Sequence, residues 1–311
     1  MTVLECAKLL QEQDDILIIT HHRPDGDTLG SAAALCRGLQ SLGKRAYLFP
    51  NPQVTETYAP FVAPYLAPAG FEPTYTVAVD VADTNMFALG YAGRVDMAID
   101  HHPTNSGYAP HTLVMSEKAS CGEIVLLVLR ALCGALDPGM ASLLYIAVST
   151  DTGCFVYGNT TADTHRAAAE LMDAGADSGM LNKLIFRTFS AARLMLEGMV
   201  YTGLRRYRDG QINIAVITLD MLRRAGTTEA DCEDLASLAG KIAGNKVSVT
   251  VRELRPGHCK VSVRTGHEVD ASAVCAKFGG GGHKMAAGCE LDAGPDETAD
   301  KLLQAINEVW Q

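Results

Sequence analysis

Short apolar runs alternate with longer segments of helical periodicity over the first half of the chain. The short runs are ILIIT (16–20), RAYLF (45–49), TVAVD (76–80) and VDMAID (95–100). The longer segments are LGSAAALCRGLQSLG (29–43), CGEIVLLVLRALCG (121–134) and MASLLYIAVST (140–150). Buried strands that alternate with helices are typical of a parallel α/β sheet. The pattern therefore predicts an α/β domain with a parallel sheet and helices on both faces.

The pattern changes after residue 188. Residues 187–206 have the periodicity of a long helix that leaves the first domain, and we expect 189–206 to form a linker helix. Beyond it, INIAVITLD (212–220), KVSVTVREL (246–254) and CKVSVRTG (259–266) alternate as strands do. The sequence thus predicts a first domain at 1–188 and a smaller α+β domain at 207–311.

Acidic residues and histidines recur where the apolar runs of the first domain end. These residues are His21, Asp25, Asp27, Asp80, Asp100, His101, His102 and Asp151. In open α/β sheets, ligands bind at the carboxyl edge of the strands. We therefore expect four separate segments to converge on one site at that edge.

Composition and charge narrow the choice of partners. The chain has 311 residues, with 36 acidic and 26 basic side chains and a formal net charge of −10. A protein that binds long nucleic acid normally carries a basic surface that neutralises many phosphates. The charge therefore argues against long duplex nucleic acid as a partner, although it allows a small phosphorylated ligand.

The sequence also predicts a soluble, cytoplasmic protein that makes no use of a membrane. The strongest apolar stretch, EIVLLVLRALCGAL, is interrupted by Arg130. Glu5 and Lys8 stand where a signal peptide would need an apolar core. The nine cysteines form no C-x-x-C pair, which fits a reducing compartment.

The segment HHRPDGD, which follows the first run, is the first candidate for chemistry. Pro24 and Gly26 favour a tight turn that holds Asp25 and Asp27 close together, where their repulsion would favour a bound cation. An alternative is an ordinary turn in which Asp27 or Thr28 caps a helix beginning near Leu29. That alternative leaves the positions of His21 and Asp25 unexplained.

The candidate ligands combine imidazoles with carboxylates and include no thiolate. They are His21, Asp25, Asp27, Asp80, His101 and Asp151. Taken singly, Asp80 and Asp151 could equally be cap or turn residues. As a set, these groups suit manganese, magnesium or a similar divalent ion better than structural zinc. Six ligands are too many for one catalytic ion that must keep open positions, so we expect two ions. A pair of such ions can hydrolyse phosphate esters through a nucleophile that bridges both ions.

A second motif, KFGGGGHKMAAG, lies near the C-terminus. Four consecutive glycines, Gly279–Gly282, predict a loop whose bare backbone N–H groups can approach an anion, with His283 beside it. A flexible linker is the alternative. Arg264 ends an earlier strand and could clamp a phosphate or carboxylate, or could simply be a solvated strand-end residue.

These motifs resemble the DHH phosphoesterase family, in which an Asp-His-His triplet corresponds to Asp100, His101 and His102. HHRPDGD, Asp80, TDTGCF and the glycine-rich segment resemble the other motifs of the family, in the same order. The resemblance implies one metal held by His21, Asp25 and Asp80. It implies a second metal whose ligands are Asp27, Asp80, His101 and Asp151, with Asp80 bridging the two ions.

The resemblance also implies how substrate is bound. His102 would lie beside the scissile phosphate as a phosphate contact or proton donor. The C-terminal domain would close over the sheet edge, so that Arg264, Gly279–Gly282 and His283 grip a nucleotide in the cleft between the domains. The expected ions are two divalent metals, manganese first, with magnesium or cobalt as alternatives. A homodimer is compatible with the sequence.

Within the family, two compact domains of this length resemble bifunctional enzymes that degrade short oligoribonucleotides and remove the 3′-phosphate of 3′-phosphoadenosine 5′-phosphate. Short RNA and this nucleotide bisphosphate are therefore the expected substrates. A stand-alone phosphodiesterase of cyclic di-AMP or linear diadenylate is one alternative, and a non-catalytic nucleotide-binding regulator is another. His22, Arg23 and Thr265 depart from the family pattern, which bears on substrate preference and not on metal binding.

Overall fold

The structure, a computed structural model, describes residues 1–228, 232, 235 and 238–310. The chain divides into two compact units, Met1–Thr188 and Phe189–Gln311. Each unit has its own sheet and its own buried core, and each is described below by itself.

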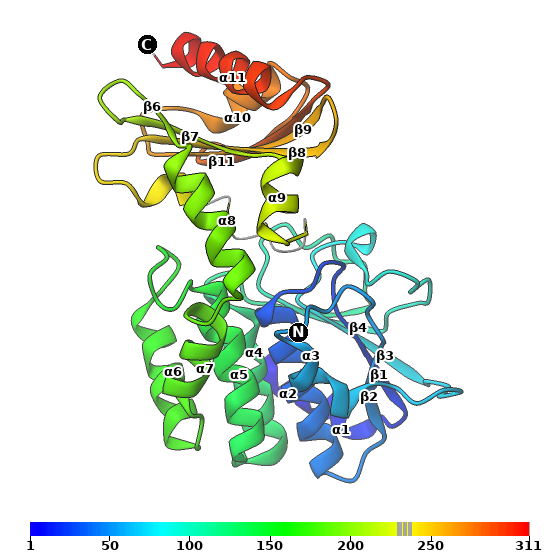
Figure 1. Cartoon of the computed structure of the whole chain (residues 1–311). Coiled ribbons are helices and arrows are strands. Elements are labelled where there is room, and N and C mark those ends of the chain that lie inside the picture. The colour runs from blue at the N-terminus through cyan, green and yellow to red at the C-terminus, as the bar shows by residue number, and fades with distance from the viewer. Residues whose placement is uncertain (229–231, 233–234, 236–237, 311) are drawn as a thin grey trace. The chain divides into compact units, whose positions relative to one another are not determined.

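The first unit is built on a five-stranded parallel sheet in the order β2-β1-β3-β4-β5 (Figure 1). Its strands are β1 (Ile16–Ile19), β2 (Ala46–Leu48), β3 (Tyr75–Val79), β4 (Met97–Asp100) and β5 (His111–Val114). The three central strands β1, β3 and β4 are entirely buried, as expected for a parallel sheet. Because the strands are parallel, the residues that follow β1, β3 and β4 meet at one edge.

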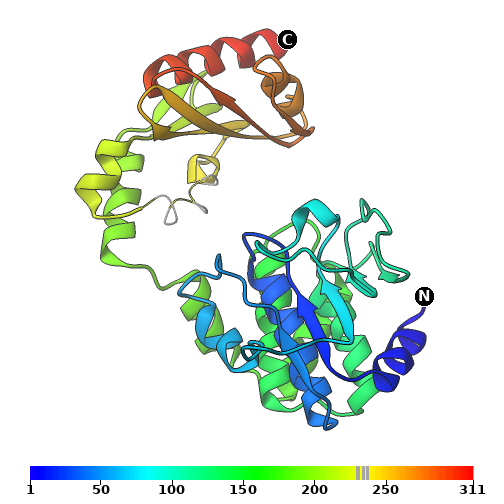
Figure 2. The ribbon, with the colours of Figure 1, turned by 90° about the vertical axis from the view of Figure 1, so that its right-hand side faces the viewer.

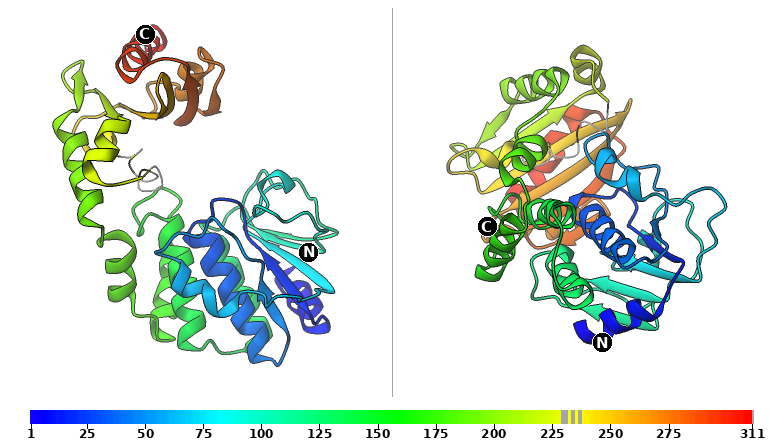
Figure 3. Two further views of the ribbon diagram at one scale, coloured as in Figure 1. Left: turned by 45° about the vertical axis from the view of Figure 1, so that its right-hand side comes forward. Right: turned by 90° about the horizontal axis from the view of Figure 1, so that it is seen from below.

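The long helices of the first unit share one apolar cluster with one face of the sheet. The helices of this unit are α1 (Val3–Glu12), α2 (Gly26–Ser41), α3 (Ala59–Val62), α4 (Cys121–Cys133), α5 (Pro138–Asp151), α6 (Ala162–Asp173) and α7 (Ser178–Phe186), with short 3₁₀ turns η1 (Ala63–Tyr65) and η2 (Thr84–Met86). Helices α2 and α5 lie side by side (Figure 3). Ile16, Ile18 and Val77 are among the sheet side chains of this cluster.

The opposite face of this sheet differs from the prediction of helices on both faces. Leu17, Ile19 and Ala78 pack there against aromatic side chains from the connecting segments. These aromatic side chains are Phe49, Phe71, Phe87, Tyr91 and Tyr108. The connection from β3 to β4 carries only the short turn η2. Aromatic side chains cover this face instead.

Asp151 differs from the candidates that follow strands, because it belongs to a helix. It is the last residue of helix α5 and does not follow a strand. A continuous apolar run can be a buried strand or a helix buried on most sides, and periodicity cannot separate the two. Helix α5 is of the second kind, since every residue from Leu143 to Ser149 is buried. Three strand ends and one helix end therefore meet in this unit.

The second unit contains a six-stranded mixed sheet in the order β10-β11-β9-β8-β7-β6. Its elements are α8 (Ala191–Thr202), β6 (Arg205–Tyr207), β7 (Ile212–Ile217), α9 (Leu219–Ala225), β8 (Val247–Arg255), β9 (His258–Thr265), α10 (Ala271–Ala276), β10 (Gly281–His283), β11 (Ala286–Leu291) and α11 (Pro295–Val309). Helices α10 and α11 cover one face (Figure 2). Helices α8 and α9 pack on the other face against Ala215 and Ile217 of β7.

Two elements of this unit differ in extent from the predictions. The helix expected at 189–206 is shorter, since α8 ends at Thr202 and Arg205 already belongs to β6. Part of the expected glycine loop is a strand, because β10 begins at Gly281 and pairs with β11. A Cβ atom at Gly280 would stand 2.3 Å from the Gly288 oxygen. The bare backbone is thus needed for close strand packing.

Candidate metal centre

The turn after β1 places Asp25 at the start of helix α2. Asp25 is the N-cap residue, and its Oδ1 accepts hydrogen bonds from the N–H groups of Asp27 (3.0 Å) and Thr28 (3.1 Å). The alternative of a cap at Asp27 or Thr28 is therefore wrong, because the helix begins at Gly26. Capping uses one oxygen of Asp25, and its side chain remains 59% exposed toward solvent.

Asp27 is held by the N-terminus of a different helix. Its Oδ2 accepts from the Cys121 N–H (2.7 Å), and its Oδ1 accepts from the Gly122 N–H (2.9 Å) and the Ser31 hydroxyl (3.0 Å). Cys121 and Gly122 are the first residues of α4, whose free N–H groups favour a negative charge. A buried carboxylate is thereby fixed at the carboxyl edge of the sheet.

Asp80 lies between two groups of potential ligands. Its Oδ2 lies 3.7 Å from His21 Nε2, and its Oδ1 lies 3.5 Å from His101 Nε2. The side chain is only 3% exposed, yet Oδ1 accepts no hydrogen bond from any residue that the structure describes. Its backbone is left-handed, at φ +60°, a conformation that aspartate adopts more readily than most residues. A buried carboxylate oxygen without a donor is what a cation would satisfy.

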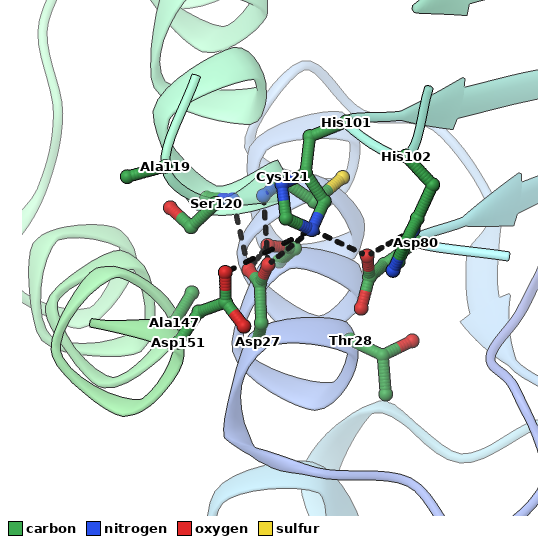
Figure 4. Close-up of polar contacts among 12 residues, drawn as sticks. Asp27, Thr28, Asp80, His101, His102, Ala119, Ser120, Cys121, Ala147 and Asp151 are labelled. Carbon is green, nitrogen blue, oxygen red and sulfur yellow. Dashed lines mark hydrogen bonds and ion pairs between the residues drawn. The ribbon is translucent and has the colours of Figure 1, made fainter. Parts of the chain in front are cut away.

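His21 and His101 are each oriented by a backbone carbonyl. His21 Nδ1 lies 2.8 Å from the His22 oxygen, and His101 Nδ1 lies 3.3 Å from the Lys118 oxygen. If Nδ1 carries the proton in each ring, Nε2 is left as a lone-pair donor that faces the carboxylates. In Figure 4 the His101 ring stands among Asp27, Asp80 and Asp151.

Asp151 reaches this group because two helices approach closely. Its Oδ2 lies 3.8 Å from His101 Nε2. A Cβ atom at Gly30 of α2 would stand 2.4 Å from the Leu143 oxygen of α5, and one at Gly26 would stand 2.5 Å from the Thr150 side chain. The two glycines therefore let the start of α2 lie against the end of α5, and Asn159 donates from Nδ2 to the Asp151 backbone oxygen (3.1 Å).

Asp100 organises the histidines without facing the centre itself. Its Oδ1 accepts from the backbone N–H groups of His101 (2.8 Å) and His102 (3.1 Å) and lies 2.7 Å from His102 Nδ1. Asn105 donates to its Oδ2 (2.7 Å). The bond to Asp100 raises the pKa of His102, whose side chain is 37% exposed. His102 is thus a partly exposed imidazole that favours its protonated form.

The electrostatics of the buried carboxylates fit a cation site. Burial, together with the charges of Asp151 and Asp25, raises the pKa of Asp27 well above its usual value. Burial and the charges of Asp27 and Asp25 do the same to the pKa of Asp80. Positive charge placed among these groups would relieve their repulsion.

All six predicted ligands thus lie together, in two groups with a shared neighbour. His21, Asp25 and Asp80 form one group, and Asp27, His101 and Asp151 form the other. Asp80 also groups with His101 and His102. Sequence reasoning missed the supporting residues Asn51, Asn105 and Asn159. It named Asp100 as the first member of the Asp-His-His triplet but did not predict its supporting role.

The residues predicted to bind substrate lie in the second unit. His283, Ala286 and Arg264 face one another across β10, β11 and β9, so their side chains share one face of the sheet. Arg264 and His283 are exposed, and alanine stands between them. That face is opposite the one on which Ala287 and Val263 pack against α10 and α11. The glycine-rich hairpin thus forms an open edge beside an exposed arginine and histidine.

The chain is thus a two-domain α/β protein. Its parallel sheet carries imidazoles and carboxylates that could hold metal ions at its carboxyl edge, and a mixed-sheet domain follows. Two known domains match the chain, the DHH family N-terminal domain at residues 15–148 and the DHHA1 domain at residues 211–311. The chain belongs to the DHH family.

Relatives with known names span almost the full chain. A bifunctional oligoribonuclease and PAP phosphatase NrnA of Thermus thermophilus is 33% identical over 94% of this chain and 89% of its own length. The protein of the same name from Bacillus subtilis is 25% identical over 96% of each chain. A cyclic-di-AMP phosphodiesterase GdpP of Geobacillus thermodenitrificans is 24% identical over 98% of this chain, which spans 49% of that protein.

Solved structures share the fold. An exopolyphosphatase-related protein from Bacteroides fragilis superposes with a TM-score of 0.86 at 23% identity, over 98% of this chain and 95% of its own. Exonuclease RecJ bound to manganese superposes with a TM-score of 0.57 at 17% identity, over 99% of this chain and 94% of its own. Among the residues that the structure describes, no helix is both long and apolar enough to span a membrane.

Proposed function

We propose that this protein is a metal-dependent phosphohydrolase that degrades short oligoribonucleotides to mononucleotides and dephosphorylates 3′-phosphoadenosine 5′-phosphate to AMP. The observation that carries the proposal is the position of Asp80, which directs one carboxylate oxygen toward each of two histidine-carboxylate groups. The names of the full-length relatives from Thermus thermophilus and Bacillus subtilis support the choice of substrates.

Two divalent ions fit these side chains. In this proposal His21, Asp25 and Asp80 hold one ion, and Asp27, Asp80, His101 and Asp151 hold the other. The orphaned Oδ1 of Asp80 and the raised pKa values of Asp27 and Asp80 support it. Manganese is the first choice, with magnesium or cobalt as alternatives. When bound, such ions activate water for attack on phosphorus and neutralise the charge of the phosphate.

The remaining residues of the centre handle the proton and the geometry. His102 acts beside the scissile phosphate as a phosphate contact or as the donor of a proton to the leaving oxygen. Asp100 favours the protonated imidazole and fixes its direction through Nδ1. The carbonyls of His22 and Lys118 keep the Nε2 atoms of His21 and His101 directed at the carboxylates.

The second unit supplies substrate contacts in this proposal. Arg264 and His283 share an exposed sheet face, and a guanidinium can bind a phosphate with two hydrogen bonds. The N–H groups of Gly279 and Gly280 already donate to the oxygens of Ala276 (3.1 Å) and Cys275 (3.0 Å). Of the predicted segment Gly279–Gly282, it is therefore the backbone of Gly281 and Gly282, which no side chain screens, that the substrate would approach. Substrates are short RNA and nucleotide bisphosphates, and long duplex nucleic acid is not a partner. An enzyme for such metabolites would work in the cytoplasm.

Hydrolysis assays test the proposal directly. Purified protein with manganese is expected to release AMP from diadenylate and phosphate from 3′-phosphoadenosine 5′-phosphate, and a chelator should abolish both reactions. Magnesium and cobalt are compared in parallel. Failure on both substrates would overturn the proposal. Faster turnover of cyclic di-AMP than of diadenylate would favour the phosphodiesterase alternative instead.

A further inference from the structure

Arg23 is an exposed cation in the turn that carries two of the candidate metal ligands. It lies between His21 and Asp25 in the chain, and its guanidinium forms no ion pair with any residue that the structure describes. Its backbone is left-handed, at φ +50°, which is uncommon for a residue other than glycine. Its amide N–H donates to Gln53 Oε1 at 2.9 Å. The conformation of Arg23 is thus fixed by a contact with the loop that follows β2.

The same loop is tied to the metal centre through Asn51. The Asn51 Nδ2 group donates to the His21 backbone oxygen (2.9 Å) and to the Thr20 hydroxyl (3.1 Å). Its Oδ1 accepts from the Gln53 N–H (3.0 Å). Asn51 is buried, so these bonds are shielded from water. The loop, Arg23 and the ligand His21 therefore form one hydrogen-bonded assembly.

A cavity of about 260 Å³ lies beside this assembly. It is lined by Pro50, Asn51, Pro52, Val54, Ala59, Val62, Ala63 and Leu66. Cavities for drug-sized ligands usually measure about 300–1,000 Å³, so this one suits a single flat ring system. The lining is apolar apart from Asn51, whose amide is already hydrogen-bonded to the protein. Such a cavity accepts the faces of a nucleobase and reads little of its hydrogen-bonding edge.

We propose that Arg23 and this cavity form a subsite for a 5′-phosphorylated nucleoside, with the base in the cavity and the 5′-phosphate on Arg23. The inference rests on the proposed function. The phosphoryl group on the 3′ oxygen of the same nucleoside then lies at the metal centre. A 5′-phosphorylated dinucleotide and 3′-phosphoadenosine 5′-phosphate share this element, so one subsite serves both reactions.

The charges at the centre favour a phosphate at Arg23 over other occupants. The side chains of Asp25, Asp27 and Asp80 at the candidate metal centre are acidic and repel an anionic ligand, so a cation in the turn between His21 and Asp25 favours its binding. A guanidinium remains charged at all working pH values and matches phosphate oxygens with two hydrogen bonds. The few polar groups in the cavity predict tolerance toward the base, as an enzyme that degrades RNA of any sequence requires.

The phosphate contact is tested with diadenylate that either carries or lacks a 5′-phosphate. Arg23→Gln is expected to raise KM for the phosphorylated dinucleotide about tenfold or more, with kcat and manganese affinity unchanged and with little effect on the unphosphorylated one. The KM of Arg23→Lys for the phosphorylated dinucleotide should lie between those of the wild-type protein and Arg23→Gln. Arg94→Gln is the matched control, because Arg94 is exposed before β4 and thus lies at the other edge of the sheet. An equal effect of Arg23→Gln on both dinucleotides overturns the phosphate contact.

The cavity is tested by filling it from its rim. Ala63 is exposed, so Ala63→Phe adds a ring without disturbing the core. KM for the phosphorylated dinucleotide should rise about tenfold, whereas a dinucleotide that lacks the 5′ base should be cleaved equally by both proteins. An unchanged KM for the intact dinucleotide overturns the base site. If the wild-type protein cleaves none of these substrates, the proposed function itself is wrong. If the wild-type protein is active and the variant has the same KM, only the subsite is wrong.

Discussion

His102 Nδ1 and Asp100 Oδ1 lie 2.7 Å apart, so the His102 imidazole is held by Asp100, the first residue of the same Asp-His-His triplet. The same oxygen accepts the backbone N–H groups of His101 and His102. We expect Asp100→Asn to lower kcat about 10- to 100-fold, the usual cost of losing such a supporting group. Because Asp100 acts through His102, the double variant with His102→Gln should be no slower than His102→Gln alone. Additive losses in steady-state assays would contradict this pairing.

Asp80→Asn is expected to weaken metal binding without destabilising the fold. The activity of the variant should fall by more than about 100-fold, because the loss of a residue that only supports a metal ligand already lowers activity by up to about 100-fold. Isothermal titration should show one manganese site or none. In the metal-free protein, burial raises the pKa of Asp80, so a neutral amide at this position should not lower the melting temperature. Wild-type manganese binding by this variant would overturn the role of Asp80.

Gly30→Ala tests the close approach of α2 and α5. The added Cβ would stand 2.4 Å from the Leu143 oxygen, a backbone atom that cannot move alone. We expect a loss of about 1–3 kcal/mol in the free energy of unfolding, together with weaker manganese binding, because Asp151 is displaced from His101. Gly198→Ala is the matched control in α8, where nothing lies within 4 Å. It should stabilise the protein by about 0.5–1 kcal/mol.

Asp137 connects α2 to α5 at the end far from the candidate metal centre. It caps α5 through the N–H groups of Gly139 and Met140 and pairs with Arg37 Nε at 2.7 Å. The two side chains are 40% and 37% exposed, so solvent screens the ion pair, and we expect Asp137→Ala to cost mainly the cap, about 1–2 kcal/mol. Asp173→Ala, at the exposed end of α6, should change stability by less than about 0.5 kcal/mol.

The effect of Asp137→Ala should depend on pH. Burial would raise the pKa of Asp137, but Arg37 and the N–H groups of α5 outweigh it and lower the pKa. Stabilisation by this carboxylate is then complete above its ordinary pKa of about 3.9 and is lost as the pH falls through the lowered value. Denaturant titrations of wild type and variant should therefore differ at pH 7 and converge toward pH 2. A constant difference would show that the charge of Asp137 is unimportant.

The sequence predicted the parts of the centre that depend on local pattern. His21, Asp80 and His101 follow apolar runs that are too short and too β-branched to be helices, so their place at a sheet edge could be expected. Asp151 could not be placed in this way, because it ends helix α5 and not a strand, so the order of the parallel sheet does not fix its position. The position of Asp151 near His101 depends on the close contacts that Gly26 and Gly30 of α2 make with α5. The sequence pattern of one helix alone does not predict such contacts.

Supporting residues were harder to predict than ligands. Asn51 bonds to His21 across 30 positions, and its sequence neighbours Pro50 and Pro52 indicate only a loop. The glycine-rich segment was expected to be a loop, yet half of it is a strand, because glycine at 280 and 282 permits backbone approach that a side chain would prevent. Such contacts arise from tertiary packing, which local propensity does not encode.

The position of Asp151 at the end of α5 limits how the chain length can vary. Each residue inserted into α5 ahead of Asp151 would turn its side chain by about 100° around the helix axis and move it by about 1.5 Å. Helix α5 contacts α2 through backbone, so it cannot rotate to compensate. Length changes should therefore be tolerated between Gly134 and Asp137, before the helix begins, and should abolish activity between Met140 and Thr150.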